Sequence, residues 1–401
     1  MQSRLKVMFV CATALLLAPL SPASARSFAV IHAFQGGNDD GSASVSGLIS
    51  DRAGNLYGAT LSGGPGNGGH GYGTVYKLAP DGTVTVLYAF QAGSDGELPY
   101  AGVIRDKKGN LYGTTEAGGG TVCDGYGCGT VFRIAPDGTE ALLHSFQGLP
   151  DAFGPTSGLA ADNAGNFYGT AHGGTDNCGT VFKIAPDGTE TILHSFTCGS
   201  DGADPFGSVI VDSGGSLYGM TTTGGNTQLC GRAGCGVVYK LAPDGSETVL
   251  HTFTGGKDGG EPDGNLIADA AGNLYGMTTI GGRHGLGVAF RLAPDGTETV
   301  LHSFGHGLDG QEPEAGLVLD NAGNLYGTTP FGGLSCGFFT CGTVFRIASD
   351  GTEKVLYRFT GGSDGCGPGW ADTLLVKRHT LVGTASGCGA DGNGTIFELK
   401  K

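Results

Sequence analysis

The stretch Asp320-Asn-Ala-Gly-Asn-Leu-Tyr-Gly-Thr-Thr329, followed by Gly342-Thr-Val-Phe-Arg-Ile-Ala-Ser-Asp-Gly351, decides the fold because both halves recur along the chain. Its tyrosine returns as Tyr57, Tyr112, Tyr168, Tyr218, Tyr275 and Tyr326. By subtraction, successive tyrosines lie 55, 56, 50, 57 and 51 residues apart. A nearly constant period of this size is typical of a protein built from structural repeats.

Each repeat predicts four short β-strands. In the copy quoted above, apolar residues 316–320 are followed by an Asn-Ala-Gly-Asn turn and a second strand over residues 325–329. A third strand over residues 343–347 leads through a Ser-Asp-Gly turn into a fourth over residues 354–359. Four-stranded repeats of this length favour the blades of a β-propeller over a sandwich.

The two ends of the chain predict how the propeller closes. Thr380-Leu-Val-Gly-Thr384 is a degraded seventh copy of the tyrosine motif, and its repeat has a third strand over residues 394–399 but no fourth. Ser27-Phe-Ala-Val-Ile-His-Ala-Phe34 matches the fourth strand at residues 299–304. We therefore predict an all-β, seven-bladed propeller over residues 26–401, in which the N-terminal strand completes the last blade.

Residues 1–25 have the pattern of a secretory signal peptide. Arg4 and Lys6 precede an apolar run from Val7 to Leu20, and Ala23-Ser-Ala25 forms a cleavage site. The run is too short to span a bilayer, and no second apolar segment or C-terminal sorting segment follows. We expect a monomeric protein that is secreted or periplasmic and is not inserted in a membrane.

The charge of the chain bears on its partners. The formal net charge is −15, which argues against nucleic acid and anionic membranes because both require basic patches. An acidic surface suits cations, or it serves solubility alone. The 80 glycines recur at fixed repeat positions, so we interpret them as turn and close-packing residues rather than as low complexity.

Of the 11 cysteines, Cys11 lies in the signal peptide, and the even number that remains predicts disulfides in an exported protein. Shared spacing and equal distance from hairpin turns predict these pairs: Cys123–Cys128, Cys178–Cys198, Cys230–Cys235, Cys336–Cys341 and Cys366–Cys388. Zinc is the alternative, but the C-x₄-C pairs lack a second set of ligands at the usual spacing, so we expect no metal and no cofactor.

The repeats D-x-x-G-N-L-Y-G-T-T and G-T-V-F-[KR]-[IL]-A-P-D-G-T-E resemble those of the GloVer tandem-repeat proteins, a bacterial exported family described as "choice-of-anchor". The resemblance covers nearly all of residues 46–365. It implies a secreted or surface propeller and brings no established reaction or catalytic residues. A looser similarity to NHL-type and lactonase-like propellers supports only the register of the blades.

The 10 histidines fall into groups by their place in the repeat. His32, His144, His194, His251 and His302 share one fourth-strand position, where Tyr88 and Tyr357 substitute. A position that accepts His or Tyr indicates packing between blades. The loops from strand two to three and from strand four to the next blade share one face, here called the upper face. They hold His70, His172, His284 and His306, which either converge near the axis or are separate surface residues; His379 lies in a turn of the opposite face.

A second set of candidates follows a proline in the loop that enters each first strand. After Pro99, Pro155, Pro205, Pro262, Pro313 and Pro368 come Tyr100, Thr156, Phe206, Asp263, Glu314 and Gly369, with Trp370 beyond. First strands line the channel of a propeller, so these residues should rim its upper mouth. Aromatic rings beside Asp263, Glu314, Glu261 and Glu312 are typical of a sugar-binding funnel, although ordinary loop packing around proline is the alternative.

Asp-Gly pairs also recur in these loops, at Asp95, Asp201, Asp258, Asp309 and Asp364. None has the ligand spacing of a calcium loop, so we interpret each Asp as the cap of a turn.

Three functions stay open. The first is a binding module for a glycan or cell-surface polymer at Tyr100, Phe206, Glu261, Asp263, Glu314 and Trp370. The second is a polysaccharide lyase or hydrolase that uses His172, His284 or His306 with Glu312, Glu314 or Asp263. The third is a purely structural module.

Overall fold

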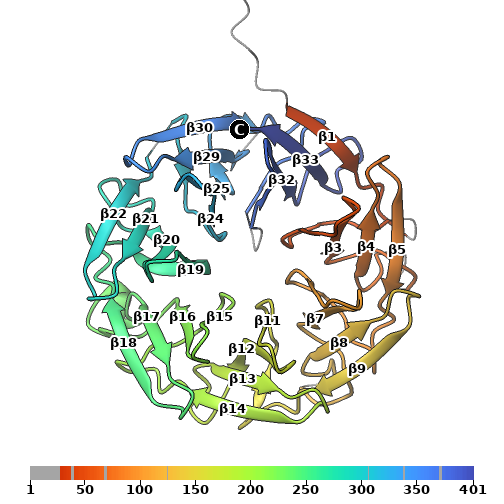
Figure 1. Cartoon of the computed structure of the whole chain (residues 1–401), viewed down its shortest axis with the longest axis horizontal. Coiled ribbons are helices and arrows are strands. Elements are labelled where there is room, and N and C mark those ends of the chain that lie inside the picture. The colour runs from red at the N-terminus through yellow and green to blue at the C-terminus, as the bar shows by residue number, and fades with distance from the viewer. Residues whose placement is uncertain are drawn as a thin grey trace, which may run out of the picture.

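The structure is a computed structural model that describes residues 28–37, 40–66, 70–123, 125–305, 307–336, 339–369 and 373–401. Within them, seven antiparallel blades surround a central axis, each built on four strands and one of them with a fifth strand added (Figure 1). The fold is therefore the all-β, seven-bladed propeller that the repeats predict. The predicted signal peptide at residues 1–25 lies outside the described residues.

We number the blades in chain order. Blade 1 contains β2 (Ile49–Ser50), β3 (Leu56–Thr60), β4 (Thr74–Leu78) and β5 (Val84–Ala89). Blade 2 contains β6 (Ile104–Arg105), β7 (Leu111–Thr115), β8 (Thr130–Ile134) and β9 (Glu140–Ser145). Blade 3 contains β11 (Ala160–Ala161), β12 (Phe167–Gly173), β13 (Thr180–Ile184) and β14 (Glu190–Ser195), with β10 (Ala152–Phe153) paired to β12. Blade 4 contains β15 (Ile210–Val211), β16 (Leu217–Thr221), the 3₁₀ turn η2 (Cys230–Arg232), β17 (Val237–Leu241) and β18 (Glu247–Thr252).

Blade 5 contains β19 (Gly260–Ala268), β20 (Leu274–Ile280), β21 (Val288–Leu292) and β22 (Glu298–Ser303). Blade 6 contains β24 (Val318–Leu319), β25 (Leu325–Thr329), β29 (Thr343–Ile347) and β30 (Glu353–Arg358). Its upper loops add the short pairs β23 (Gly310–Gln311) with β26 (Phe331–Gly332) and β27 (Ser335–Cys336) with β28 (Phe339–Thr340). Blade 7 contains β31 (Leu375–Val376), β32 (Thr380–Ala385), β33 (Thr395–Lys400) and β1 (Phe28–Ala33).

Blade 7 confirms the predicted closure. The degraded motif at residues 380–384 forms β32, which lies between β31 and β33. The N-terminal strand β1 pairs antiparallel with β33, from Phe28 opposite Leu399 to Ala33 opposite Thr395 (Figure 1). The outer edge of β33 is therefore covered by a strand from the other end of the chain, and the ring has no open seam.

The tyrosine motif builds a hydrogen-bonded turn on the lower face, opposite the upper loops. In blade 1, Asp51 Oδ1 accepts from the backbone N–H of Ala53 at 2.9 Å and of Asn55 at 3.0 Å. Its Oδ2 accepts from Asn55 Nδ2 at 2.8 Å and from the Tyr57 hydroxyl at 2.9 Å. The Asp, Asn and Tyr of the motif are thus used to close the turn between the first and second strands.

The glycine of Leu-Tyr-Gly makes room for an aromatic ring of the third strand. In blade 2, a Cβ atom at Gly113 would lie 2.6 Å from Cζ of Phe132, and the equivalent contact recurs in the other blades. Phe132 is fully buried and packs edge-on against Phe90 of blade 1, with 5.1 Å between ring centroids. The motif is therefore a scaffold element whose glycine permits the packing between neighbouring blades.

The fourth-strand histidines occupy the predicted positions between blades. The ring of His302 lies edge-on to Phe304 at 4.9 Å, and its Nε2 is 3.2 Å from Asp309 Oδ2. Tyr357, which replaces histidine in blade 6, donates its hydroxyl proton to Asp364 at 2.9 Å. Asp364 also accepts the backbone N–H of Thr360 at 2.8 Å, as expected for an aspartate that caps a turn.

Candidate functional site

The candidate site lies on the propeller axis at its upper mouth, and the prolines that enter each first strand position it. In blade 5, Gly236 at the preceding loop leaves room for Pro262, since a Cβ there would lie 2.6 Å from the proline Cδ. Glu261 has the left-handed φ of 51°, and its N–H donates to the carbonyl of Cys235 at 2.8 Å. These contacts fix the backbone so that Asp263 is carried toward the axis.

The same anchor links the mouth to the disulfides. The structure joins the five cysteine pairs that the sequence predicts. In blades 3, 4, 5 and 7, the residue before the proline donates its N–H to the backbone carbonyl of a disulfide-bonded cysteine. The bonds are Gly154 to Cys128 at 2.8 Å, Asp204 to Cys178 at 2.9 Å, Glu261 to Cys235 at 2.8 Å and Gly367 to Cys341 at 3.1 Å. The disulfides therefore stabilise the loops that carry the mouth residues.

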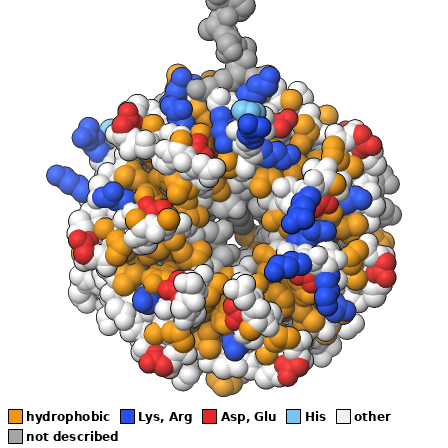
Figure 2. Space-filling view, in the orientation of Figure 1, with side chains coloured by type: hydrophobic (Ala, Val, Ile, Leu, Met, Phe, Trp, Pro, Cys, Tyr) orange, Lys and Arg blue, Asp and Glu red, His pale blue; other side chains and the backbone are white. Residues whose placement is uncertain are grey.

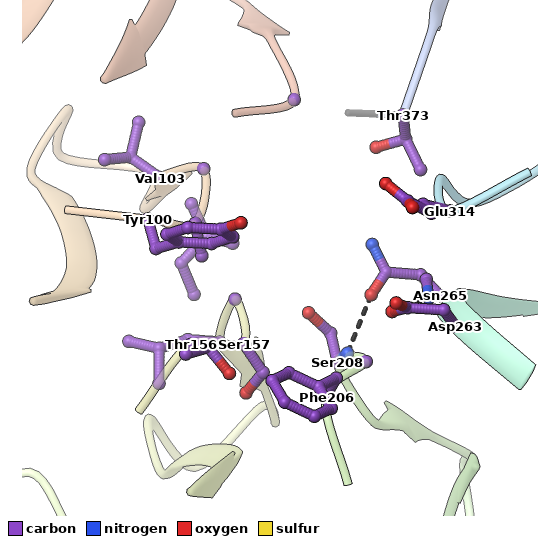
Figure 3. A pocket seen from close by; sticks show the side chains of 18 of the residues that line it. Tyr100, Val103, Thr156, Ser157, Phe206, Ser208, Asp263, Asn265, Glu314 and Thr373 are labelled. Carbon is purple, nitrogen blue, oxygen red and sulfur yellow. Dashed lines mark hydrogen bonds between the residues drawn. The ribbon is translucent and has the colours of Figure 1, made fainter. Parts of the chain in front are cut away.

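A cavity of about 650 Å³ opens between these loops. It is lined by Tyr100, Thr156, Phe206, Asp263 and Glu314, each from a different blade. Figure 3 shows the Tyr100 ring across from the carboxylates of Asp263 and Glu314, with Phe206 at the edge between them. The structure thus brings together five of the residues that the sequence places after a proline.

Burial, and for Glu314 also the repulsion of neighbouring carboxylates, changes the protonation of the two acids. Burial raises the pKa of Asp263 to about 6, although the backbone N–H of Gly264, 2.7 Å from its Oδ1, opposes the shift. Burial, together with the charges of Asp263 and Glu312, raises the pKa of Glu314 to about 7. Near neutral pH, this pair therefore holds a proton that is readily released.

Tyr100 responds to the same charges. Burial and then the charges of Asp263, Glu116 and Glu314 raise the pKa of its hydroxyl. The phenol therefore stays protonated at neutral pH and remains a hydrogen-bond donor inside the cavity.

The inner wall of the cavity is largely backbone. A Cβ at Gly207 would lie 1.9 Å from the carbonyl oxygen of Gly264, so blades 4 and 5 meet there without side chains between them. The N–H of Ser208 donates to Asn265 Oδ1 at 2.7 Å and joins the same two blades (Figure 3). Polar groups of Ser157, Ser208 and Thr373 complete the lining.

The remaining predicted candidates lie in different places. His172, at the end of β12, lines the cavity and lies edge-on to Phe206, with 5.4 Å between ring centroids. His284 is instead beside Gly305, where a Cβ would lie 3.4 Å from its Cδ2, and His70 is exposed on a loop. Glu261 and Glu312 hold the left-handed position before proline and do not line the cavity. Trp370 and His306 lie outside the described residues.

Sequence reasoning missed Glu116, Asn265, Ser157 and Thr373 as lining residues. The repeat does carry a signal for three of these residues. Asn265 and Thr373 occupy the position of the small residue that opens each first strand, and Ser157 directly precedes that position. Glu116 follows the second strand, one position after a recurring threonine pair. Its approach to the cavity depends on the course of the following loop, which the motif does not specify.

One group of side chains elsewhere has the spacing of metal ligands. His302, Asp309 and Glu353 offer atoms that all lie within 4.8 Å of one another, on the outer rim between blades 5 and 6. Burial raises the pKa of Glu353, and the Asp309 charge adds to this while His302 opposes it. The same residue types recur between other blades, where they pair in twos, so we interpret the group as blade packing.

Comparison with known proteins places the chain by its repeats. A family model for the Gloeobacter/Verrucomicrobia repeat matches residues 19–232 and 225–401. The chain belongs to this repeat family. No curated protein matches it in sequence. Membership in the Gloeobacter/Verrucomicrobia repeat family agrees with the resemblance seen in the tyrosine motif.

Solved structures share the fold at low identity. The extracellular domain of a hybrid two-component system protein from B. thetaiotaomicron has a TM-score of 0.55 and 14% identity, covering 94% of this chain and 42% of that one. A puromycin hydrolase complexed with PGG has a TM-score of 0.50 and 10% identity, covering 87% and 50%. A protein assigned as a gluconolactonase has a TM-score of 0.42 and 13% identity, covering 94% and 93%.

This member of the Gloeobacter/Verrucomicrobia repeat family spans about half the length of the first two structures, and at these identities the likeness shows the fold alone. Within the described residues, we find no helix of the length and apolarity that crossing a bilayer would need. Five disulfides indicate a protein that belongs outside the reducing cytoplasm.

Proposed function

We propose that the protein is an exported binding module that holds a sugar polymer in the cavity at its upper mouth. The observation that carries the proposal is that Tyr100, Phe206, Asp263 and Glu314 line one cavity, with the Tyr100 ring across from the two carboxylates. Aromatic rings stack on the apolar faces of sugars, and carboxylates accept hydrogen bonds from their hydroxyl groups. An open cavity of about 650 Å³ also supports a binding role over a purely structural one.

The exposure of Phe206 suits a polymer that lies across the mouth of the cavity. Phe206 is 39% exposed although it is a large apolar side chain, and it rests on the edge of His172. An apolar ring held at the rim of a cavity is typical of a contact surface rather than of a core. Trp370 stands two residues after Pro368 in blade 7 and remains a predicted member of this ring set.

The test is binding of the purified mature protein to an array of plant and bacterial polysaccharides. We expect the double variant Tyr100→Ala, Phe206→Ala to lose at least about tenfold in affinity, since stacking contributes about 1 kcal/mol or more per ring. Tyr126→Ala is the matched control, because Tyr126 is an upper-face aromatic that is 74% exposed and does not line the cavity. A wild-type protein that binds no polysaccharide would disprove the proposal.

A second candidate function is hydrolysis of the bound polymer. Glu314, with a pKa of about 7, would donate a proton to the glycosidic oxygen, and Asp263 would accept one from the attacking water. Here the expected result is release of reducing ends, abolished by Glu314→Gln. Binding without any new reducing ends would leave the protein a binding module.

Export is part of the proposal. Residues 1–25 have the pattern of a signal peptide, and the disulfides require an oxidising compartment. We expect the mature protein to begin at Arg26, which N-terminal sequencing of the protein recovered from the periplasm or the medium would check. Recovery of the full-length chain from the cytoplasm would contradict it.

A further inference from the structure

We propose that the polymer bound at the upper mouth is cationic, and specifically that it is a chain of amino sugars with free amino groups. This inference rests on the proposed function and names its ligand class. Four features of the molecule carry it: the charge of the cavity wall, the rings that face it, the spacing of the carboxylates and the distribution of charge between the two faces.

The cavity wall holds carboxylates without a counter-cation. Asp263, Glu314 and Glu116 all line it, and no Lys or Arg stands among the described lining residues. Neither Asp263 nor Glu314 has an ion-pair partner in the described part of the chain. Taking such groups out of water is costly unless they are paired, so an ammonium group on the ligand would supply the missing partner.

The protonation behaviour of this wall supports the same conclusion. Burial raises the pKa of Asp263, and burial followed by repulsion from Asp263 and Glu312 raises the pKa of Glu314. A bound cation would lower both values and release protons. A neutral sugar gains no such Coulomb attraction from two carboxylates.

The aromatic side of the cavity also suits a cation. The Tyr100 ring lies across from the two carboxylates, and Phe206 flanks it at the rim (Figure 3). The faces of aromatic rings attract ammonium groups as well as the apolar faces of sugars. A hexose ring that carries an amino group can therefore meet both sides of the cavity at once.

The carboxylates are spaced for an organic cation rather than a metal ion. Within the described residues, the group that brings three ligand atoms within 4.8 Å of one another is His302, Asp309 and Glu353, on the outer rim. The carboxylates of the cavity are not gathered to that degree. They surround a cavity of about 650 Å³, which is large for a bare ion and suitable for a sugar unit.

Charge is also divided between the two faces. In the upper-face loops the Lys and Arg residues are Arg232, Lys257 and Arg283, and none of them lines the cavity. The lower face carries Arg105, Lys107, Lys108, Lys377, Arg378 and Lys401, and Figure 2 shows blue side chains gathered there over blades 1 and 2 and near the C-terminus. A molecule with an acidic upper face draws a cationic polymer toward the mouth and repels an anionic one.

The experiment is isothermal titration of the mature protein with three hexamers at pH 6 and low salt, where the amino groups of glucosamine are protonated. The probes are the hexamer of glucosamine, the hexamer of N-acetylglucosamine and cellohexaose, which share ring size and linkage but differ in charge. We expect the glucosamine hexamer to bind about tenfold or more tightly than either neutral hexamer, and its affinity to fall as salt is raised.

Two pairs of variants localise the effect. Asp263→Asn with Glu314→Gln removes two charges from the cavity and should reduce affinity for the glucosamine hexamer about tenfold or more. Asp176→Asn with Asp391→Asn removes two exposed upper-face charges that do not line the cavity, and should change affinity less than about twofold. Thermal unfolding of each variant checks that it is folded.

Each outcome separates the inference from the proposed function. Equal or tighter binding of a neutral hexamer overturns the inference and leaves the sugar-binding function standing. Retention of full affinity by the Asp263→Asn, Glu314→Gln variant also overturns it, because the attraction would then arise from the general surface charge. If no hexamer binds and the polysaccharide array is also negative, the proposed function fails as well.

Discussion

The two faces of the propeller differ in what they repeat. On the lower face, Asp, Asn and Tyr make the same hydrogen bonds in blade after blade, as Asp51 does in blade 1 and Asp269 in blade 5. At the upper mouth, the residue after the proline changes from Tyr100 to Phe206 to Asp263, although the same backbone anchor holds it. The fold does not require these differences. The repeated face is therefore the scaffold, and the unrepeated face is where we place the candidate site.

We expect the largest effect on stability when the ring is opened. Deleting residues 28–34 removes β1 and the fully buried Phe34, which packs on Tyr76 of blade 1 at 5.4 Å. We expect loss of cooperative folding, because the cost exceeds the roughly 5–15 kcal/mol that stabilises a typical domain. Circular dichroism and size-exclusion chromatography would measure it, with a chain lacking residues 1–25 as the control. A deletion variant that melts within a few degrees of this control would contradict the closure.

We expect the second largest loss of stability at a closely packed glycine of the scaffold. Gly113→Ala places a methyl group 2.6 Å from the Phe132 ring, and we expect a loss of about 1–3 kcal/mol in the free energy of unfolding. Gly351→Ala is the matched control, since its Cβ would meet nothing within 4 Å and only the left-handed φ of 84° opposes it. That control should cost about 1 kcal/mol. Denaturant unfolding compares the two, and a larger loss for Gly351→Ala would refute the packing account.

A lower-face turn should matter less, and in a pH-dependent way. Burial alone would raise the pKa of Asp106, but hydrogen bonds from Asn110, Tyr112 and Lys108 more than offset it and lower the pKa. A lowered folded-state pKa contributes stability above the unfolded value near 4 that is lost as pH falls through the folded value. Asp106→Ala should therefore cost about 1–2 kcal/mol at pH 7 and less at pH 3.

Asp81→Ala serves as the control for that turn. Asp81 caps a different lower-face turn, the one between the third and fourth strands of blade 1. It accepts a hydrogen bond from the backbone N–H of Thr83 at 3.0 Å. It has fewer partners than Asp106, so its removal should cost less. Unfolding curves for both variants at pH 7 and pH 3 give the comparison, and equal losses at the two pH values would argue against a charged Asp106.

The smallest effect on stability is expected at the upper mouth. Phe206 is 39% exposed, so Phe206→Ala should change the free energy of unfolding by about 0.5 kcal/mol or less. The same variant should weaken polysaccharide binding, which would sharpen the division between the two faces. A mouth residue whose removal destabilises the protein as much as Gly113→Ala would blur that division.

The repeat allowed the blade number, the closure and the disulfide pairs to be predicted, because a fixed period assigns every residue to a strand or a loop. It also placed Tyr100, Phe206, Asp263 and Glu314 at one mouth, since each follows the proline at an equivalent position. It did not show which other side chains reach the cavity. Glu116 arrives from the far end of a second strand, and its approach depends on loop packing that the period does not encode.

Blade 5 shows a second feature that the repeat does not predict. Its first strand, β19, runs over Gly260–Ala268, whereas β24 in blade 6 covers only Val318–Leu319. The pairing with β20 shifts register between Asp263 and Ile267, and this irregularity sets where Asp263 and Asn265 stand on the axis. No turn motif marks the bulge. The raised pKa of Glu314 likewise depends on Asp263 from the neighbouring blade, so it follows from the assembled ring and not from any one repeat.

The pairing of β1 with β33 has a consequence for synthesis. The ribosome releases Phe28–Ala33 before any other strand and Thr395–Lys400 after all of them, so the pair that shuts the ring is the last to become available. Until then the partly folded chain is an arc with apolar faces at both ends, and such exposed surface favours aggregation. A message read with a premature stop therefore leaves an arc that cannot close. Closure of the ring therefore requires that synthesis has reached β33.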